Sequence, residues 1–273
     1  MGNDDSLVPS AGYAPGWRRV PTLTPVTSTS DHLRRALSDD PSGPRLTFYD
    51  DATGERIELS TTTLANWVAK TVNLLILECG VGPGSHVALH LPRHWTTAVW
   101  VLAADAVGVE VSASPPGASA ASPVDVAVIG PDRVDDPPDA EEVFAVSLAP
   151  LAAPFARSLP TLVRDYTLEV RAMPDQISGP AGPAGPLGAM AEARAAAQRL
   201  EPSDRVAALG DLRGLPSLID DWLAPLAVGA SVLWIRNPDP ARCVPRWATE
   251  RVTAVSSTLP NGVVLPEAIR LLT

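Results

Sequence analysis

Apolar residues recur every three or four positions between Ser60 and Glu78. That spacing predicts a helix with one buried face, and the Ser60 hydroxyl is placed to cap its first turn. The buried face consists of Leu64, Trp67, Val68, Val72, Leu75 and Ile76. Upstream, the apolar runs 46–49 and 57–59 flank the turn Asp50–Gly54, which predicts a β-hairpin.

Short apolar runs follow this helix and alternate with further helical segments. Strands are predicted at 87–91, 109–112, 125–129, 143–147, 205–209, 231–235 and 252–256. Helices are predicted at 31–37 (capped by Ser30), 94–106, 162–173, 189–200, 217–228 (kinked at Pro225) and 240–250, with an unfinished helix after Pro266. Alternation of this kind is typical of βαβ units. The predicted fold class is therefore α/β, with two stacked lobes that each contain a mainly parallel sheet flanked by helices.

Composition divides the chain into three parts. Residues 1–29 are rich in Pro, Ser, Thr and Gly without periodicity, and they are predicted to form a flexible arm. Residues 30–150 are predicted to form the first α/β lobe, and residues 151–273 the second. Within the second lobe, the Pro/Gly-rich stretch 176–190 is predicted to be a stiff linker.

Charge and hydropathy exclude several function classes. The chain has 273 residues and a net charge of −10, so it lacks the excess of basic residues that phosphate backbones require. No apolar run reaches the roughly 18 residues that span a bilayer. Cys79 and Cys243 lie in apolar helical segments, which favours a reduced, cytoplasmic setting. We expect neither nucleic acid nor membrane as a partner.

Lysine is almost absent from the sequence. Lys70 is the single lysine among 21 basic residues, and the others are arginine. Any mechanism that needs a catalytic lysine therefore depends on Lys70. Because Lys70 falls on the polar side of the helix predicted at 60–78, we interpret it as a charge on the helix surface.

Three histidines are spaced at intervals of four: His86, His90 and His94. Imidazoles are common metal ligands, but Pro92 interrupts the strand before His94, and no cysteine or carboxylate joins the group. No metal site is predicted.

Asp220 and Asp221 are adjacent on a predicted helix and therefore point in different directions. We interpret them as part of a solvated face rather than as an acid–base pair. The tryptophans at apolar periodic positions are predicted to pack in the core rather than to stack on a flat ligand. They are Trp67, Trp95, Trp100, Trp222 and Trp234.

Several segments match, in order and spacing, motifs of one enzyme superfamily. They are Leu46–Tyr49, Leu59–Ser60, Gly80–His86 (against "lGvkpGDrV"), Leu91–Pro92, Ala103–Val109 (against "lkaGav"), and the run from Leu223 to Val232 (against "LlaGatvvl"). Over about residues 31–270 the chain resembles the N-terminal part of AMP-forming adenylating enzymes, which include acyl-CoA synthetases, luciferases and adenylation domains. The segments GERIELS, LANWVAKTVNLL and DYTLEVRAMPD resemble more closely a family of short uncharacterised actinobacterial proteins related to those enzymes.

The resemblance implies a phosphate loop, which in the superfamily has the pattern TSGTTGxPKG. The matching stretch here is ISGPAGPAGP, residues 177–186. Ser178, Gly179 and Gly182 match the pattern, whereas both threonines and the lysine are replaced. The prolines also remove backbone N–H groups that would bind anions. The resemblance therefore implies a degenerate phosphate loop, with ATP or AMP as the possible cofactor.

Other superfamily motifs have no counterpart. The Phe-His pair of "LPLFHxxG" is replaced by Leu209–Gly214, and the adenine motif, the ribose-binding Asp and the C-terminal domain that carries the adenylation lysine find no match. We expect no catalytic residues, and a non-catalytic or degenerate relative that acts as a binding or regulatory scaffold for an unknown protein or small molecule. One alternative is a half-enzyme that binds ATP or an acyl-adenylate and is completed by a separate partner. Another is an unrelated small ligand held between the lobes.

Overall fold

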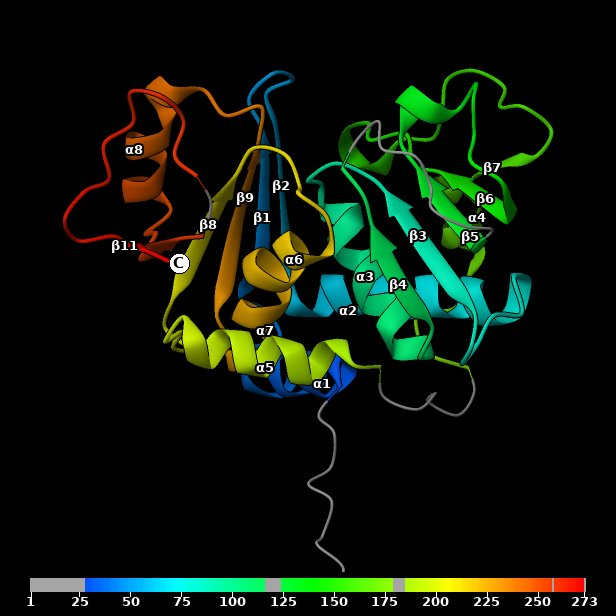
Figure 1. The fold of residues 1–273 in the computed structure, drawn as a ribbon, viewed down its shortest axis with the longest axis horizontal. Helices are drawn as coiled ribbons and strands as arrows, with labels where there is room; N and C mark the ends of the chain where they lie inside the picture. The colour runs from blue at the N-terminus through cyan, green and yellow to red at the C-terminus, as the bar shows by residue number, and fades with distance from the viewer. Residues whose placement is uncertain (1–27, 116–123, 179–184, 257, 273) are drawn as a thin grey trace, which may run out of the picture.

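The computed structural model describes residues 28–115, 124–178, 185–256 and 258–272 (Figure 1). Most of the predicted arm 1–29 lies outside these residues. The described residues form an α/β fold with two sheets, one of six strands and one of five. Apart from the hairpin strand β2, every strand pair in the described part is parallel, which confirms the predicted fold class.

The six-stranded sheet has the order β11-β10-β8-β9-β1-β2, and the five-stranded sheet has the order β4-β3-β5-β6-β7. The strands of the first sheet are β1 (Pro44–Asp50), β2 (Glu55–Ser60), β8 (Arg205–Leu209), β9 (Ser231–Arg236), β10 (Ala254–Val255) and β11 (Arg270–Leu271). Those of the second are β3 (His86–His90), β4 (Glu110–Ala113), β5 (Val124–Ile129), β6 (Ala140–Ala145) and β7 (Val163–Asp165).

Helices fill the space between the sheets, and one helix covers the outer side of the six-stranded sheet. In Figure 1, α2 and α3 lie between the two sheets, α8 lies on the outer side of the six-stranded sheet, and α1 and α5 run along the lower edge. The helices are α1 (Thr29–Asp39), α2 (Thr61–Asn73), α3 (Trp95–Val107), α4 (Tyr166–Ala172), α5 (Leu187–Ala197), α6 (Leu215–Leu218), α7 (Ala224–Val228) and α8 (Pro240–Thr249).

The sheets are buried on both faces, as expected for parallel strands. On β9, Val232 and Trp234 enter the large core shared with α2, α3 and the other sheet, whereas Leu233 and Ile235 pack outward beneath α8. The five-stranded sheet alternates in the same way, with Val128 facing the shared core. Most of the apolar burial therefore lies between the sheets and holds them together.

Local capping explains where the first helices start. Ser60 accepts a hydrogen bond from the Thr63 N–H and caps α2, as predicted. The predicted helix 60–78 forms as α2 followed by the π-helical turn Leu74–Glu78. The first helix starts earlier than predicted, because Ser28 and Asp31 form a reciprocal capping box and Ser30 lies inside α1.

Three predicted helices differ from the structure. Segment 162–173 begins as strand β7, because Val163 pairs with Val143 and Asp165 then caps α4. Segment 217–228 contains the π-helical turn Ile219–Leu223, which continues directly into α7. Pro225 has no N–H to donate to the Asp221 carbonyl, and Trp234 Nε1 donates to that carbonyl over 3.1 Å. The helix predicted after Pro266 is wrong, since the chain there pairs with β10 as strand β11.

The predicted boundary near residue 150 does not separate the two sheets. The hairpin β1–β2 belongs to the predicted first lobe, yet β1 pairs with β9 in the six-stranded sheet. Conversely, β7 follows residue 150 but completes the five-stranded sheet. Hydrophobic periodicity identifies the strands but carries no information on their partners, so it predicts lobes that follow the order of the chain rather than the pairing of the strands.

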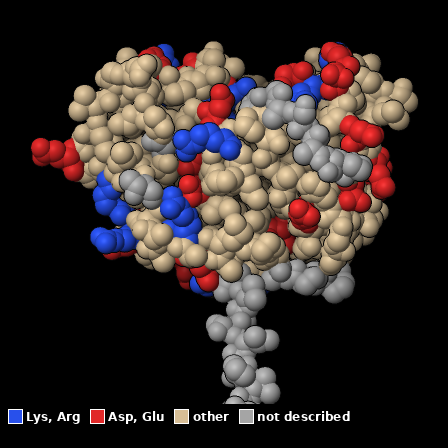
Figure 2. All heavy atoms as spheres, viewed as in Figure 1, with Lys and Arg blue, Asp and Glu red and all other residues tan. Residues whose placement is uncertain are grey.

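The surface agrees with the acidic composition. On the face in Figure 2, acidic side chains gather over the side of the five-stranded sheet, and most basic ones over the side of the six-stranded sheet. The described residues on this face show no continuous basic stripe. Within the described ranges, no helix is long and apolar enough to cross a lipid bilayer.

Trp222 provides a test of the shared core. Its side chain is fully buried, donates to the Ala98 carbonyl over 3.2 Å, and lies 6.2 Å from the Trp234 ring. We expect Trp222→Ala to lower the free energy of unfolding by about 3–5 kcal/mol, because it leaves a cavity. Urea denaturation measures this change. The exposed Leu168→Ala is the control and should change stability by about 0.5 kcal/mol or less. Equal effects of the two variants would contradict the assignment of Trp222 to the core.

Candidate functional site

The carboxyl ends of the parallel strands in both sheets lie on one side of the molecule, at the top of Figure 1. Ligands of open α/β sheets bind in the crevice outside these ends. The segments that reach this edge are those after β3, β5 and β6 in one sheet, and those after β8, β9 and β10 in the other. The candidate site is therefore built by both sheets together.

A cavity of about 440 Å³ opens at this edge. It is lined by Pro92, Pro131, Asp132, Ser147, Leu148 and Arg236, which follow strands β3, β5, β6 and β9. Its volume falls within the range of small-molecule sites, about 300–1,000 Å³. Leu148 adopts a positive φ of 54°, and Leu151 and Ala152 follow with φ of 57° and 52°. Such backbone strain in non-glycine residues concentrates at functional sites.

A buried ion pair joins the two sheets at the same edge. Arg93 Nη2 lies 2.7 Å from Asp221 Oδ2, and the side chains are 1% and 0% exposed. The Ser256 hydroxyl donates to the other carboxylate oxygen over 2.7 Å, and Arg93 Nε donates to the Gly210 carbonyl over 2.8 Å. The Arg93 guanidinium also lies 5.3 Å from the centroid of the Trp234 ring. The ion pair and these two hydrogen bonds thus hold the segments after β3, β8 and β10 to one another.

The prediction of a solvated face for Asp220 and Asp221 is wrong for Asp221. Asp220 is partly exposed and pairs with Arg194 over 2.6 Å, whereas Asp221 is fully buried. Both residues lie in the π-helical turn Ile219–Leu223. A π-helical turn inserts one residue into the helix and so changes which side chains face inward, and such turns are frequent at functional sites.

Arg236 is the cation that lines the cavity. Its Nη1 atom lies 3.7 Å from Asp50 Oδ2, and its Nε atom is buried with no hydrogen-bond partner among the described residues. A buried donor without a partner carries a cost that a bound acceptor would relieve. Arg236 is therefore the residue best placed to contact an anionic group of a ligand. The sequence signal was its position at the end of β9, which periodicity alone does not mark as functional.

The three histidines are separate in space, with different partners. His86 Nε2 lies 2.7 Å from the Ser112 hydroxyl, and His90 Nδ1 lies 3.0 Å from an Arg133 nitrogen. His94 caps α3 by accepting from the Thr96 N–H. In the ranges that the structure describes, no three His, Cys, Asp or Glu side chains gather in a way that could hold a metal ion.

The predicted phosphate loop is described only at its edges, and Gly179 and Gly182 lie outside the described residues. Ser178 is described, and its backbone N–H donates to Asn73 Oδ1 over 2.9 Å. The Asn73 amide in turn donates to the carbonyls of Pro174 and Gln176 over 2.9 and 2.8 Å. The segment that leads into the loop is therefore held to the end of α2.

Lys70 takes part in the same attachment. Its ammonium group donates to the Met173 carbonyl, and the residue is half-buried rather than free on the helix surface as predicted. Neither Lys70 nor Ser178 lines the cavity at the carboxyl edge. The structure thus holds the matched serine against the end of α2, the helix that also carries the single lysine.

Comparisons with known proteins agree with this fold. No protein-family model matches the chain. Among solved structures, an acetoacetyl-CoA synthetase from Streptomyces lividans superposes with a TM-score of 0.67 at 18% sequence identity. The match covers 85% of this chain but 42% of the synthetase, so the chain spans less than half of that enzyme's length. The chain therefore has the fold of the N-terminal region of an adenylate-forming enzyme.

A curated relative shows the family. A TIGR03089 family protein from Mycobacterium tuberculosis (strain ATCC 25618 / H37Rv) is 44% identical over 252 residues, a match that covers 85% of this chain and 99% of the relative. The protein belongs to the TIGR03089 family. The mycobacterial source of this relative agrees with the actinobacterial resemblance found in the sequence.

The buried ion pair yields a stability prediction. Asp221→Ala leaves the Arg93 guanidinium buried without its counter-charge, and we expect it to lower the free energy of unfolding by about 3–5 kcal/mol. Asp220→Ala, the neighbouring control, removes a partly exposed pair and should cost about 1 kcal/mol or less. The double variant Arg93→Met/Asp221→Leu should recover much of the loss. If denaturant unfolding gives equal losses of stability for Asp221→Ala and Asp220→Ala, the buried pair does not contribute to stability in this way.

His94 yields a pH prediction. Burial, assisted by the nearby Arg236, lowers the pKa of His94 from 6.5 to about 3. Between these values the unfolded chain binds a proton that the folded protein does not, so stability falls with falling pH by roughly 1.4 kcal/mol per pH unit. His94→Asn retains a capping side chain but removes this titration. Chemical denaturation at several pH values should show a smaller acid-induced loss for the variant than for the wild type. Parallel profiles would refute the prediction.

Proposed function

We propose that the protein is a non-catalytic relative of the AMP-forming adenylating enzymes, and that it acts in the cytoplasm as a binding or regulatory scaffold. The similarity to the synthetase supports the fold and gives no evidence on activity. The proposal therefore rests on what the described residues of this chain do at the positions where the resemblance places the chemistry.

The observation that carries the proposal is the attachment of the segment 173–178 to α2. Adenylation requires backbone N–H groups and a lysine that are free to contact phosphates. Here the Ser178 N–H is used by Asn73, and the ammonium group of Lys70 is used by the Met173 carbonyl. Both groups therefore hold the segment 173–178 against α2, and the Ser178 N–H is already used by a protein acceptor.

A binding role is supported by the cavity at the carboxyl edge. It combines the apolar side chains of Pro92, Pro131 and Leu148 with the charged groups of Asp132 and Arg236. Pockets that bind small molecules have this composition, with mostly apolar walls and a few polar groups that fix orientation. We propose that the ligand or a regulatory partner contacts the protein here.

A second candidate function is a half-enzyme that binds ATP or an acyl-adenylate and is completed by a separate partner. The observation that favours it is the buried, unpartnered Nε of Arg236 at the edge where open α/β sheets bind ligands. In this proposal Ser178, Gly179 and Gly182 are the remnant of the phosphate loop.

ATP–pyrophosphate exchange and calorimetry distinguish the scaffold function from the half-enzyme function. For the purified protein, we expect no exchange with a panel of carboxylic acids, because the phosphate-loop lysine is replaced and Lys70 is hydrogen-bonded elsewhere. Exchange that Lys70→Met abolishes would overturn the scaffold proposal.

Saturable binding of ATP that Arg236→Leu removes would favour the half-enzyme instead. Arg242→Leu is the matched control, because the Arg242 side chain is 59% exposed on α8 and does not line the cavity. Equal loss of binding in both arginine variants would indicate a general charge effect and would count against a site at Arg236.

A further inference from the structure

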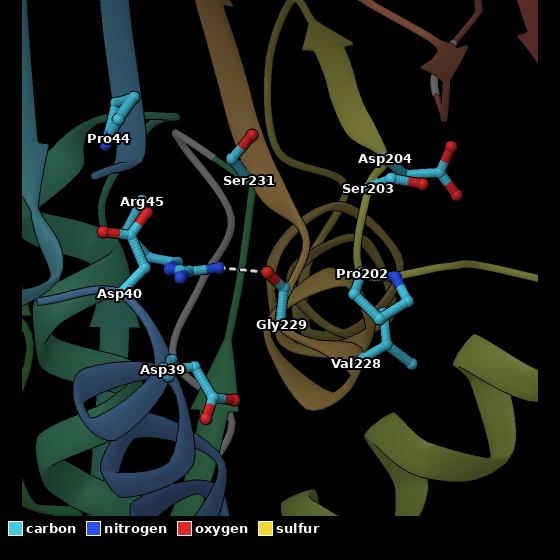
Figure 3. A pocket seen from close by; sticks show the side chains of 11 residues that line it. Asp39, Asp40, Pro44, Arg45, Pro202, Ser203, Asp204, Val228, Gly229 and Ser231 are labelled. Carbon is cyan, nitrogen blue, oxygen red and sulfur yellow. Dashed lines mark hydrogen bonds between the residues drawn. The ribbon is translucent and has the colours of Figure 1, made fainter.

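A second cavity, of about 350 Å³, opens at the opposite edge of the six-stranded sheet, beside the amino ends of β1, β8 and β9. The ends of helices α1 and α7 border it, as Figure 3 shows. Its polar lining includes Asp39, Asp40, Arg45, Ser203 and Ser231. No part of the proposed function uses this edge.

Arg45 supplies a buried positive charge to this cavity. The residue is 5% exposed, its Nε donates to the Thr61 hydroxyl over 3.3 Å, and its Nη1 donates to the carbonyls of Gly229 and Ala230. Its Nη2 atom makes no hydrogen bond to another described residue. The carboxylates of Asp39 and Asp40 form no ion pair with the guanidinium, but their negative charges favour its charged form. In Figure 3 the guanidinium lies between the end of α1 and Gly229. A charged donor is therefore available to the cavity.

Negative charge is concentrated on the wall formed by α1. Asp39 ends the helix and Asp40 caps it, and both are exposed. The Asp40 carboxylate accepts a hydrogen bond from the Gly43 N–H over 2.8 Å, and the Asp39 carboxylate accepts none from the described residues. α1 has no basic residue in its last turn, whereas Arg45 donates to the carbonyls at the end of α7.

Asp204 also lines the cavity, but its charge is already compensated. Burial opposes its ionisation, yet hydrogen bonds from Arg270, Thr253 and the Glu201 N–H lower the pKa of Asp204. The charged groups of the pocket that form no ion pair with a described residue are thus the Arg45 guanidinium and the carboxylates of Asp39 and Asp40.

We propose that this pocket binds a small zwitterion, with its anionic group on Arg45 Nη2 and its ammonium group on the carboxylates of Asp39 and Asp40. A simple anion would be attracted by the Arg45 guanidinium but repelled by the carboxylates of Asp39 and Asp40. A simple cation would be attracted by these carboxylates but repelled by the guanidinium. A molecule with both charges satisfies both walls, and the cavity volume lies within the usual range for small ligands, about 300–1,000 Å³.

Calorimetry with matched probes tests the proposal. The zwitterions are glycine, β-alanine and γ-aminobutyrate, which differ in the spacing of their charges, and the half-molecules are propionate and propylammonium. At millimolar concentrations we expect at least one zwitterion to bind, and each half-molecule to bind at least about tenfold more weakly, because each lacks one charge-assisted contact. Binding of no zwitterion, or binding of a half-molecule as tightly as the best zwitterion, would overturn the proposal.

Asp39→Asn is the decisive variant, because the Asp39 side chain makes no hydrogen bond to another described residue and its loss should not disturb folding. We expect it to weaken zwitterion binding about five- to tenfold. Asp136→Asn makes the same charge change at an exposed position outside the pocket and should leave binding unchanged. Arg45→Lys should abolish binding. Because Arg45 also holds the end of α7, wild type and variant are each measured at the same number of degrees below their own unfolding midpoint. Unchanged binding in Asp39→Asn would refute the site.

Discussion

Packing between the two sheets determines most of this structure, and the Arg93–Asp221 pair closes that packing at the carboxyl edge. The shared core is apolar, and because the hydrophobic effect is non-directional, it holds the sheets together without fixing the relative position of the segments at their carboxyl edge. A buried guanidinium and carboxylate, by contrast, tolerate little displacement, because separating them leaves an uncompensated charge out of water. The segments after β3, β8 and β10 are positioned by that constraint, and the candidate cavity opens beside them.

The polar side chains on α2 and those at the carboxyl edge of the sheets differ in how fully they are hydrogen-bonded within the protein. On α2, Lys70 and Asn73 use their hydrogen-bonding groups to hold the segment 173–178. At the carboxyl edge, Arg93 and Arg236 each keep one buried nitrogen without a hydrogen-bond partner among the described residues, but Arg93 pairs closely with Asp221 and only Arg236 lines the cavity. The scaffold function that we propose rests on this difference between a ligand-sized cavity and a lysine used for internal support.

The sequence predicted local structure better than it predicted partners. The α2 helix, the hairpin and the parallel strands follow from periodicity and capping, because those signals act within a few residues. The exchange of strands between the sheets, the burial of Asp221 and strand β7 depend on contacts between residues far apart in the chain. Ser178, which the resemblance indicates as a site residue, does not line the cavity. Arg236 and the cavity could not be predicted, because they depend on the pairing of β9 with β1 and on the position of the other sheet.

The β1–β2 hairpin has a consequence for how the molecule folds. The chain begins the six-stranded sheet, leaves to build the five-stranded sheet, and returns to complete the first. A fragment cut near residue 150 would carry β1 without β9, and the complementary fragment would carry β9 without β1. Neither half contains a complete six-stranded sheet, so each would expose an unpaired strand edge in place of the parallel pair that β1 and β9 form in the whole chain.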